Sequence, residues 1–504
     1  ASRAAGMVKV VTSGASVQIT DCLVKGSITD NADEDEREMA GFVLSNNGTY
    51  TLTRCLYVGK NNAPNDSYTF GTEHGISATF TDCYYLNTCG KAQGKQVTAE
   101  QLRNGYVAYK LQKGRESQVW GQPLGTDNEP QLTADATKRV YEVKFVYNGE
   151  VKATRYANSG KTVALPTAEE LLGAGYNPKM TYMLNFGDFT ANTPVTEDKS
   201  VDVTVTGTFN IASKEDWKAF CDLVGSGQNA VDAKMTADVD LGGDIAMVGN
   251  NYAGTFDGQN HTLKINWNSG DRIRIAPFHT VENATIKNLR TEGVISSSTH
   301  FLSGLIYDAY GTTNISGCVS NVNITSSYTG QGCDAAGMIE CVRQNAKVTI
   351  TDCLVKGKMH ATTESGRRYM SGFVNYQYGT CTLTNCLYIG DNNATGGNTF
   401  ADNATVTNCY YLKACGNKQG EQVTADQLKN GYVAYKLQAG RQYTTWGQAF
   451  GSDEPRLTDN VEYRVYKVDF TYNSQVRATR YATRNKHIYG SMPTFTPKDL
   501  LGSG

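Results

Sequence analysis

Hydrophobic and polar residues follow a short pattern that recurs along the chain: an apolar residue, two polar residues, a cysteine and a second apolar residue. The clearest example is Ile-Thr-Asp-Cys-Leu-Val-Lys-Gly, which occurs identically at residues 19–26 and 350–357. Looser versions contain Cys55, Cys83, Cys318, Cys386 and Cys409. Each copy is typical of a strand that meets a turn. Because the copies are spaced by a few tens of residues, they predict a solenoid of stacked strands.

A second pattern, glycine followed by two apolar residues, precedes several of these cysteines. It begins at Gly304, Gly337 and Gly372, before Cys318, Cys353 and Cys386. Each rung is therefore expected to contain two strands, a polar turn between them and a variable loop before the next rung. Parallel stacking would place equivalent residues about 4.8 Å apart. The sequence thus predicts a predominantly all-β fold in which inward positions form ladders of apolar residues and cysteines.

The whole pattern is duplicated. Cys353 and Cys22 are 331 residues apart (353 − 22), and so are Cys386 and Cys55 (386 − 55). The chain therefore contains about one and a half copies of a unit of roughly 330 residues, and both of its ends fall inside a unit. We expect a section of a longer repetitive protein, with continuation of the chain at both ends and with any export signal and anchor outside the section.

Short capping helices are expected at the ends of each solenoid. Ser213 is a good N-cap, and Trp217, Phe220 and Val224 form one apolar helical face that could cover the first rung. After the last rung, the capping box Thr-Ala-Asp-Gln begins at Thr424 and predicts the cap of the other end.

A small separate domain is predicted after each cap. Apolar strands at residues 141–146 and 151–156 flank Asn148-Gly149, which is a strong hairpin signal. A capping box at Thr167 predicts one short helix in the same domain.

Several segments resemble the GLUG-motif repeats of large bacterial surface proteins: the Gly-apolar strands, the Asp-Cys and Asn-Cys turns, and the turn Gly-Thr-Phe-Asp-Gly. That resemblance implies a right-handed parallel β-helix. The domain around the Asn-Gly hairpin resembles the β-grasp-like B-repeat of internalin-type surface proteins. The expected domains are part of a β-helix (1–95), a cap and linker (96–138), a β-grasp-like domain (139–208), a complete β-helix (209–417), a cap and linker (418–463) and a truncated β-grasp-like domain (464–504).

Composition and charge exclude some function classes. The 504 residues include 47 basic and 49 acidic ones without a basic stripe, so no nucleic-acid partner is expected. No apolar run of about 18 residues occurs, so no membrane span is expected in this section.

The 13 cysteines could indicate metal sites or disulfides. No Cys-x-x-Cys occurs and no histidine has zinc spacing, so neither a metal nor a cofactor is expected. The recurring cysteines are interpreted as buried thiols. For the pairs Cys83/Cys89 and Cys409/Cys415, a disulfide and a buried thiol remain equal alternatives.

No catalytic residue is assigned. The best acidic cluster consists of Asp238, Asp240, Asp244 and Asp257, which the GLUG resemblance makes turn and cap residues. His-Glu-x-x-His, Gly-x-Ser-x-Gly and phosphate loops are absent. The acidic run at residues 33–38 is interpreted as a solvated loop rather than a calcium site.

The predicted function is structural and adhesive, in a secreted or surface-anchored bacterial protein outside the cell. Host or neighbouring-cell glycans or proteins are the expected partners. They would contact the loops that differ most between the two copies, at residues 29–39, 60–78, 358–369 and 391–403. The alternatives are a carbohydrate-active β-helix enzyme and a sugar- or ice-binding module, the latter suggested by recurring Thr-x-Thr strands.

Overall fold

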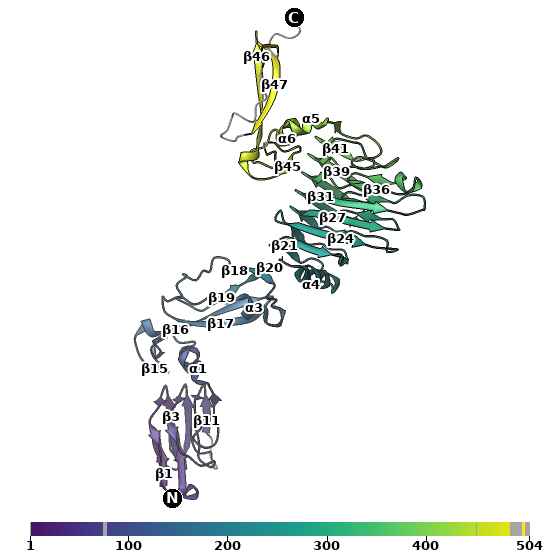
Figure 1. Ribbon diagram of the computed structural model, residues 1–504. Helices are drawn as coiled ribbons and strands as arrows, with labels where there is room; N and C mark the ends of the chain where they lie inside the picture. The colour runs from purple at the N-terminus through teal and green to yellow at the C-terminus, as the bar shows by residue number, and fades with distance from the viewer. Residues whose placement is uncertain (1, 74–77, 450, 484–495, 499–504) are drawn as a thin grey trace. The chain divides into compact units, whose positions relative to one another are not determined.

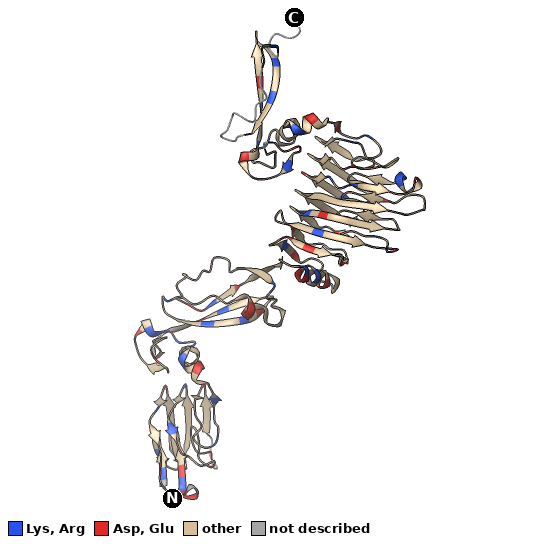
Figure 2. Cartoon of the chain, viewed as in Figure 1, with Lys and Arg blue, Asp and Glu red and all other residues tan. Residues whose placement is uncertain are grey.

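The computed structural model describes residues 2–73, 78–449, 451–483 and 496–498 (Figure 1). The chain is predominantly β, as the sequence predicted, with a few short helices. It divides into two compact units, one formed by residues 1–177 and 182–206 and the other by residues 178–181 and 207–504. Basic and acidic residues are interspersed in both units (Figure 2).

In the second unit, strands that recur along the chain pair in parallel to form four sheets, called here the sheet stack (residues 232–422; Figure 1). The first sheet contains β21 (Asp232–Met235), β23 (Thr255–Asp257), β26 (Thr285–Lys287), β30 (Thr312–Ser316), β34 (Lys347–Thr351), β39 (Thr380–Thr384) and β41 (Thr405–Thr407). The second contains β22 (Val239–Gly242), β24 (Thr262–Asn268), β27 (Arg290–Ser297), β31 (Val319–Ser326), β35 (Leu354–Val355), β36 (Met359–Ala361), β40 (Leu387–Tyr388), β42 (Tyr410–Tyr411) and β43 (Glu421–Gln422). The third contains β25 (Phe278–Glu282), β29 (Ile306–Tyr310), β33 (Ile339–Val342) and β38 (Val374–Gln377), and the fourth β28 (Leu302–Ser303), β32 (Ala335–Ala336) and β37 (Met370–Ser371).

The core of the sheet stack is a set of in-register ladders. Ile286 pairs with Ile315, Ile315 with Ile350, and Ile350 with Leu383. All four side chains are buried. The predicted inward positions of the recurring pattern therefore do form one continuous apolar core.

The backbone conformation explains why Asp or Asn precedes most of the recurring cysteines. The residue at this position has a left-handed backbone, with φ of 54° at Asp352, 55° at Asn385 and 52° at Asn408. Asp, Asn and Gly tolerate this conformation best, and it turns the chain sharply between two strands. The cysteine that follows is buried, and the Cys353 thiol donates to the Thr351 carbonyl at 3.3 Å.

Helix α4 (Lys214–Gly225) lies at one end of the sheet stack (Figure 1). Its N-cap is Ser213, whose side chain accepts from the Asp216 amide. Trp217, Phe220 and Val224 are fully buried in the core, as the predicted apolar face requires.

Helices α5 (Ala425–Lys429) and α6 (Tyr432–Gln438) follow the last rung, and with β44 (Trp446–Gly447) and β45 (Arg456–Leu457) they form the helical cover. The predicted capping box between Thr424 and Gln427 is present. Leu428, Leu437 and Trp446 make a hydrophobic cluster with Leu354 and Leu387 that is separate from the ladder core. The helical cover therefore packs along the outer side of the second sheet.

The Asp of the recurring octapeptide anchors the helical cover. Asp352 Oδ1 accepts from Trp446 Nε1 at 3.0 Å and lies 2.7 Å from Arg441 NH2. In the first unit, Asp21 makes the same contacts with Trp120 at 2.8 Å and Arg115 at 2.7 Å. The duplicated octapeptide thus forms the same turn in both units, and in both units its Asp attaches the helical cover to that turn.

The first unit contains a shorter set of parallel strands, called here the short stack (residues 2–96). One of its sheets contains β3 (Ser16–Thr20), β8 (Thr49–Thr53) and β11 (Ala78–Thr81), and another contains β4 (Leu23–Val24), β9 (Leu56–Tyr57), β12 (Tyr84–Tyr85) and β13 (Lys95–Gln96). Three further sheets are pairs of strands: β1 (Ser2–Ala5) with β6 (Arg37–Ala40), β2 (Val8–Val11) with β7 (Val43–Asn46), and β5 (Ser27–Ile28) with β10 (Lys60–Asn61). The acidic run contributes the 3-10 turn η1 (Glu34–Glu36). Helices α1 (Ala99–Arg103) and α2 (Tyr106–Gln112), with β14 (Trp120–Gly121) and β15 (Gln131–Leu132), repeat the helical cover.

The predicted hairpin of the small domain is formed by β16 (Val140–Tyr147) and β17 (Glu150–Asn158). Asn148 and Gly149 have φ of 52° and 78°, as a tight hairpin turn requires. Strand β19 (Lys199–Asp202) pairs in parallel with β16, and α3 (Ala168–Leu172) has the predicted capping box. The remaining strands are β18 (Met180–Asn185) and β20 (Thr204–Ile211), and residues 208–211 of β20 also pair in parallel with β21 in the first sheet of the sheet stack.

The second copy of this hairpin consists of β46 (Val465–Tyr472) and β47 (Gln475–Thr483). The rest of the expected truncated domain falls at residues 484–504, of which only 496–498 are among the described residues. Within the described part of the chain, no helix is long and apolar enough to cross a bilayer.

Candidate ligand-binding cleft

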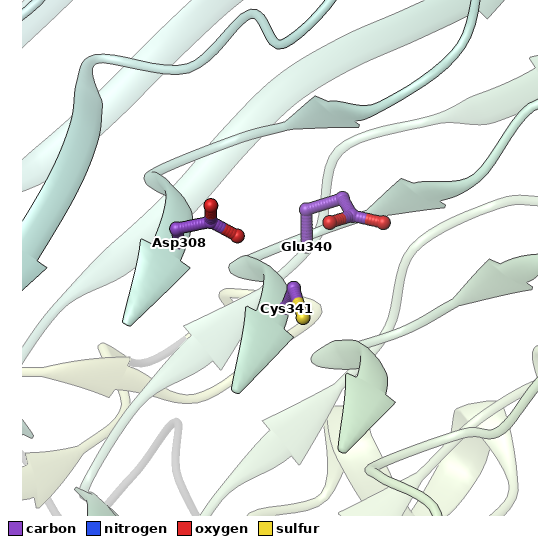
Figure 3. A group of neighbouring side chains, drawn as sticks. All are labelled: Asp308, Glu340 and Cys341. Atoms are coloured by element: carbon purple, nitrogen blue, oxygen red, sulfur yellow. The ribbon is translucent and has the colours of Figure 1, made fainter. Parts of the chain in front are cut away.

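A group of polar and aromatic side chains gathers on the third sheet of the sheet stack. Strands β29 and β33 pair in parallel, with Asp308 beside Cys341. Glu340 precedes Cys341, and the side-chain ligand atoms of these three residues lie within 4.8 Å of one another (Figure 3). Together with their neighbours they form the site that we call the cleft.

An arginine holds Asp308 in a fixed orientation. Arg343 donates from Nε to Asp308 Oδ1 at 2.7 Å and from NH2 to Oδ2 at 2.8 Å. The Asp308 side chain is only 7% exposed. This two-point contact stabilises the charged carboxylate and raises the pKa of the Arg343 guanidinium.

Glu340 has the opposite environment. Its side chain is fully buried, and Oε1 has no hydrogen-bond partner among the described residues. Burial raises the pKa of Glu340 to about 8, and the nearby Asp334 and Asp308 raise it further. At neutral pH this carboxyl group is therefore mainly protonated, and it can donate a hydrogen bond.

The donor set does not suit a cation. Arg343 already occupies the Asp308 carboxylate, and burial raises the pKa of the Cys341 thiol to about 12. A metal ion would have to displace a guanidinium and remove protons from both Glu340 and Cys341. The cleft is better suited to an uncharged hydrogen-bonding ligand.

Aromatic side chains form the walls of the cleft, which has a volume of about 310 Å³. It is lined by Arg274, Phe301, Tyr307, Asp334, Glu340, Cys341, Arg343, Tyr376 and Tyr378. A second hollow of about 430 Å³ shares Arg343 and Tyr378 with it and extends to Gln344. The two hollows therefore adjoin along one side of the sheet stack.

Two tyrosines, Tyr376 and Tyr378, line the cleft, and Tyr378 also lines the second hollow. The rings of Tyr376 and Tyr378 are 6.1 Å apart and only 12° from parallel. Tyr378 is 63% exposed, whereas the Tyr376 hydroxyl donates to Asp334 Oδ1 at 2.8 Å. Asp334 also contacts His300 Nδ1 at 3.2 Å.

The cleft follows a bend of the chain that is repeated in successive rungs. Ile275 pairs with Leu302, and Leu302 pairs with Ala335 of the next rung. The residues directly before these three, Arg274, Phe301 and Asp334, therefore occupy equivalent positions in successive rungs. All three have left-handed backbones, with φ of 66°, 65° and 43°. Such a conformation is unusual for a bulky residue such as Phe301.

Sequence reasoning missed the cleft because it searched the variable loops for ligand contacts. The useful signal was the set of residues directly after each Gly-apolar-apolar segment, Tyr307-Asp308, Glu340-Cys341 and Asn375-Tyr376. At the corresponding positions 331 residues earlier, Glu340 is replaced by Lys9 (340 − 331), Arg343 by Thr12 (343 − 331) and Tyr378 by Asn47 (378 − 331). The two copies therefore share their core pattern but not the residues of the cleft.

The acidic cluster suggested by the sequence is not assembled into one site. Asp238 contacts His261, Asp240 contacts Lys264, and Asp257 contacts Lys287. Asp244 pairs with Lys214 and Lys218 of α4. Each carboxylate stabilises a different turn or helix contact.

The structure has all thirteen cysteines as free thiols, Cys83, Cys89, Cys409 and Cys415 included. Cys83 contacts Cys55 of the preceding rung, and Cys409 contacts Cys386. Cys89 and Cys415 instead lie against the phenols of Tyr57 and Tyr388.

This arrangement predicts the outcome of a thiol titration without reductant. After denaturation we expect 13 reactive thiols per chain, because none is oxidised. In the native protein, Cys22 and Cys221 should react first, because the other eleven (13 − 2) are buried. A total of nine (13 − 4) after denaturation would instead show that the pairs Cys83/Cys89 and Cys409/Cys415 both form disulfides.

Comparisons with known proteins give little information about this chain. No family model and no curated protein match it. Among solved structures, the chain is similar to the crystal structure of a "putative immunoglobulin A1 protease" from Bacteroides ovatus. The identity is 14% and the TM-score 0.36, over 50% of this chain and 93% of the other. A likeness of this size supports neither a shared fold nor a shared activity.

Proposed function

We propose that the chain is a structural and adhesive section of a long secreted or surface-anchored bacterial protein. In this proposal, the sheet stack and the short stack are right-handed parallel β-helices that alternate with β-grasp-like domains. The resemblance to GLUG-motif repeats and B-repeats, drawn from the sequence, supports this reading. The observation that carries it is the in-register ladder from Ile286 to Leu383, which makes the core extendable rung by rung.

The helices that cover parts of the sheet stack support a mechanical role, because they shield it from other chains. Helix α4 covers one end of the core, and the helical cover is attached through Asp352. Exposed strand edges would otherwise pair with other chains. Helix α4 therefore protects one end of the core, and the helical cover protects one side of the second sheet.

The adhesive role is tested with the whole chain coupled to beads. We expect the beads to adhere to layers of host or neighbouring bacterial cells, and we expect no shortening of polysaccharides incubated with the protein. Beads that adhere no better than albumin-coated ones would contradict the adhesive role, and cleavage of a polysaccharide would contradict its non-catalytic character.

A second candidate, a carbohydrate-active enzyme, is favoured by one observation. Asp308 is held in a two-point contact by Arg343, whereas burial raises the pKa of Glu340 to about 8, and the side-chain oxygens of the two residues lie within 4.8 Å of each other. Glycosidases use such a pair as base or nucleophile and as acid. If cleavage were found, loss of that activity in Glu340→Gln would assign it to this cleft.

A further inference from the structure

The cleft combines an apolar surface with a polar floor. The ring of Tyr378 is exposed and is supported from behind by the nearly parallel ring of Tyr376. The guanidinium groups of Arg274 and Arg343 lie 5.7 Å and 6.0 Å from the centre of the Tyr307 ring. Large aromatic surfaces that remain exposed on a well-packed protein commonly mark binding sites.

The polar floor contains fixed groups with unused hydrogen-bonding capacity. Asp308 is oriented by Arg343, and Asp334 by the Tyr376 hydroxyl. Glu340 Oε1 is buried without a partner in the described part of the chain. An unsatisfied buried polar group costs free energy, which a ligand hydroxyl would recover.

Basic and acidic side chains alternate around the cleft. Arg274 and Arg343 lie near Asp308 and Asp334, and Glu340 is mainly neutral at pH 7. Neither sign of charge dominates the residues that line the cleft. Its chemistry fits a ligand with an apolar face and several hydroxyl groups.

We propose that the cleft binds an uncharged oligosaccharide. One pyranose ring stacks its C–H face on Tyr378, and its hydroxyl groups bond to Glu340 and Asp334, which line the cleft. Because the two adjoining hollows share Arg343 and Tyr378, the ligand extends over at least two sugar rings. This inference deepens the proposed adhesive function by naming the ligand class.

Comparison of the two copies predicts how many oligosaccharides bind to each chain. The short stack has Lys9, Thr12 and Asn47 where the sheet stack has Glu340, Arg343 and Tyr378. One oligosaccharide should therefore bind per chain, although the chain contains one and a half copies of the unit.

The test is a screen of the whole chain against neutral glucan, xylan, mannan, galactan and N-acetyllactosamine oligosaccharides, with uronate-containing ones alongside. Calorimetry on the best neutral ligand should give one site per chain. Tyr378→Ala should weaken binding by about tenfold or more, as expected for an aromatic anchor. Tyr443→Ala, which removes another exposed tyrosine (77% exposed) outside the cleft, should have no effect.

The pH dependence of oligosaccharide binding tests whether Glu340 contacts the ligand or only supports the fold. Wild-type binding should weaken as the pH rises through about 8, when the buried carboxyl group ionises and can no longer donate. Glu340→Gln should bind at neutral pH and lose this pH dependence, because its amide donates at all pH values. The titratable and charged groups around Glu340 are Tyr307, Asp308, Asp334, Cys341, Arg343 and Tyr376.

Three results would overturn the inference: no neutral oligosaccharide binds, only uronate-containing ones bind, or Tyr378→Ala binds as well as wild type. Continued adhesion to cells in any of these cases would leave the adhesive function standing. Binding accompanied by cleavage would support the ligand class but contradict the non-catalytic function.

Discussion

Replacing Asp352 by alanine is expected to release the helical cover from the sheet stack. The substitution removes a partly buried ion pair with Arg441 and the hydrogen bond from Trp446, and it places alanine where φ is 54°. Hydrogen bonds to a charged group contribute about 1.5–3 kcal/mol each, so losing both contacts of Asp352 costs about 3 kcal/mol or more. Hydrogen exchange in α5 and α6 should therefore become about a hundredfold faster.

The duplicated chain supplies the controls for this experiment. Exchange in α1 and α2, which are attached through Asp21, should be unchanged in the same molecule, and Asp21→Ala should give the reverse result. Asp352→Asn should have a smaller effect, because asparagine keeps an oxygen for Trp446 and tolerates the left-handed backbone. Unchanged exchange in α5 and α6 of the alanine variant would show that Asp352 does not anchor the helical cover.

Replacing Glu340 by glutamine is expected to change how stability depends on pH. The folded-state pKa of about 8 lies above the ordinary value of 4.5 for a glutamate, so the folded protein binds this proton more tightly than the unfolded chain. The stabilising contribution of the protonated group is complete below pH 4.5, decreases as the pH rises to about 8, and is lost above it. At about 1.36 kcal/mol per pKa unit, the loss is of the order of 5 kcal/mol.

Glutamine cannot ionise, so the Glu340→Gln variant should gain stability relative to wild type between pH 4.5 and pH 8. The measurement is thermal unfolding at several pH values, following the transition of the sheet stack. Glu292→Gln, on the neighbouring second sheet, is the matched control and should leave the pH dependence as in wild type. A constant difference between the Glu340→Gln variant and wild type would mean that Glu340 is not buried in its protonated form.

The sequence predicted those features that depend on local chemistry or on repetition. The β-rich class, the Asn148-Gly149 hairpin, the N-cap at Ser213 and the capping box at Thr424 all appeared in the structure. Each follows from a few neighbouring residues with a strong backbone preference. The ladder from Ile286 to Leu383 could be predicted because the pattern recurs.

The cleft could not be predicted in the same way. Tyr307, Glu340 and Tyr378 come from three different rungs, and only the register between strands brings them together. The stacked cysteines illustrate the same limit. Cys83 and Cys55 are 28 residues apart (83 − 55) in sequence, and the stacking of rungs brings them into contact. Contacts between rungs depend on loop lengths, which the recurring pattern does not specify.

The central claim is that successive rungs lie in parallel register, and cysteine cross-linking tests it most directly. Thr349 and Thr382 are paired on β34 and β39, and parallel neighbours about 4.8 Å apart lie within the reach of a disulfide. Oxidation of the Thr349→Cys, Thr382→Cys double variant should therefore give a cross-link that mass spectrometry assigns to these two positions. The Thr349→Cys, Thr405→Cys variant should give none, because Thr405 pairs with Thr382 and lies a further rung away. Equal cross-linking of both pairs, or of neither, would contradict the parallel stack.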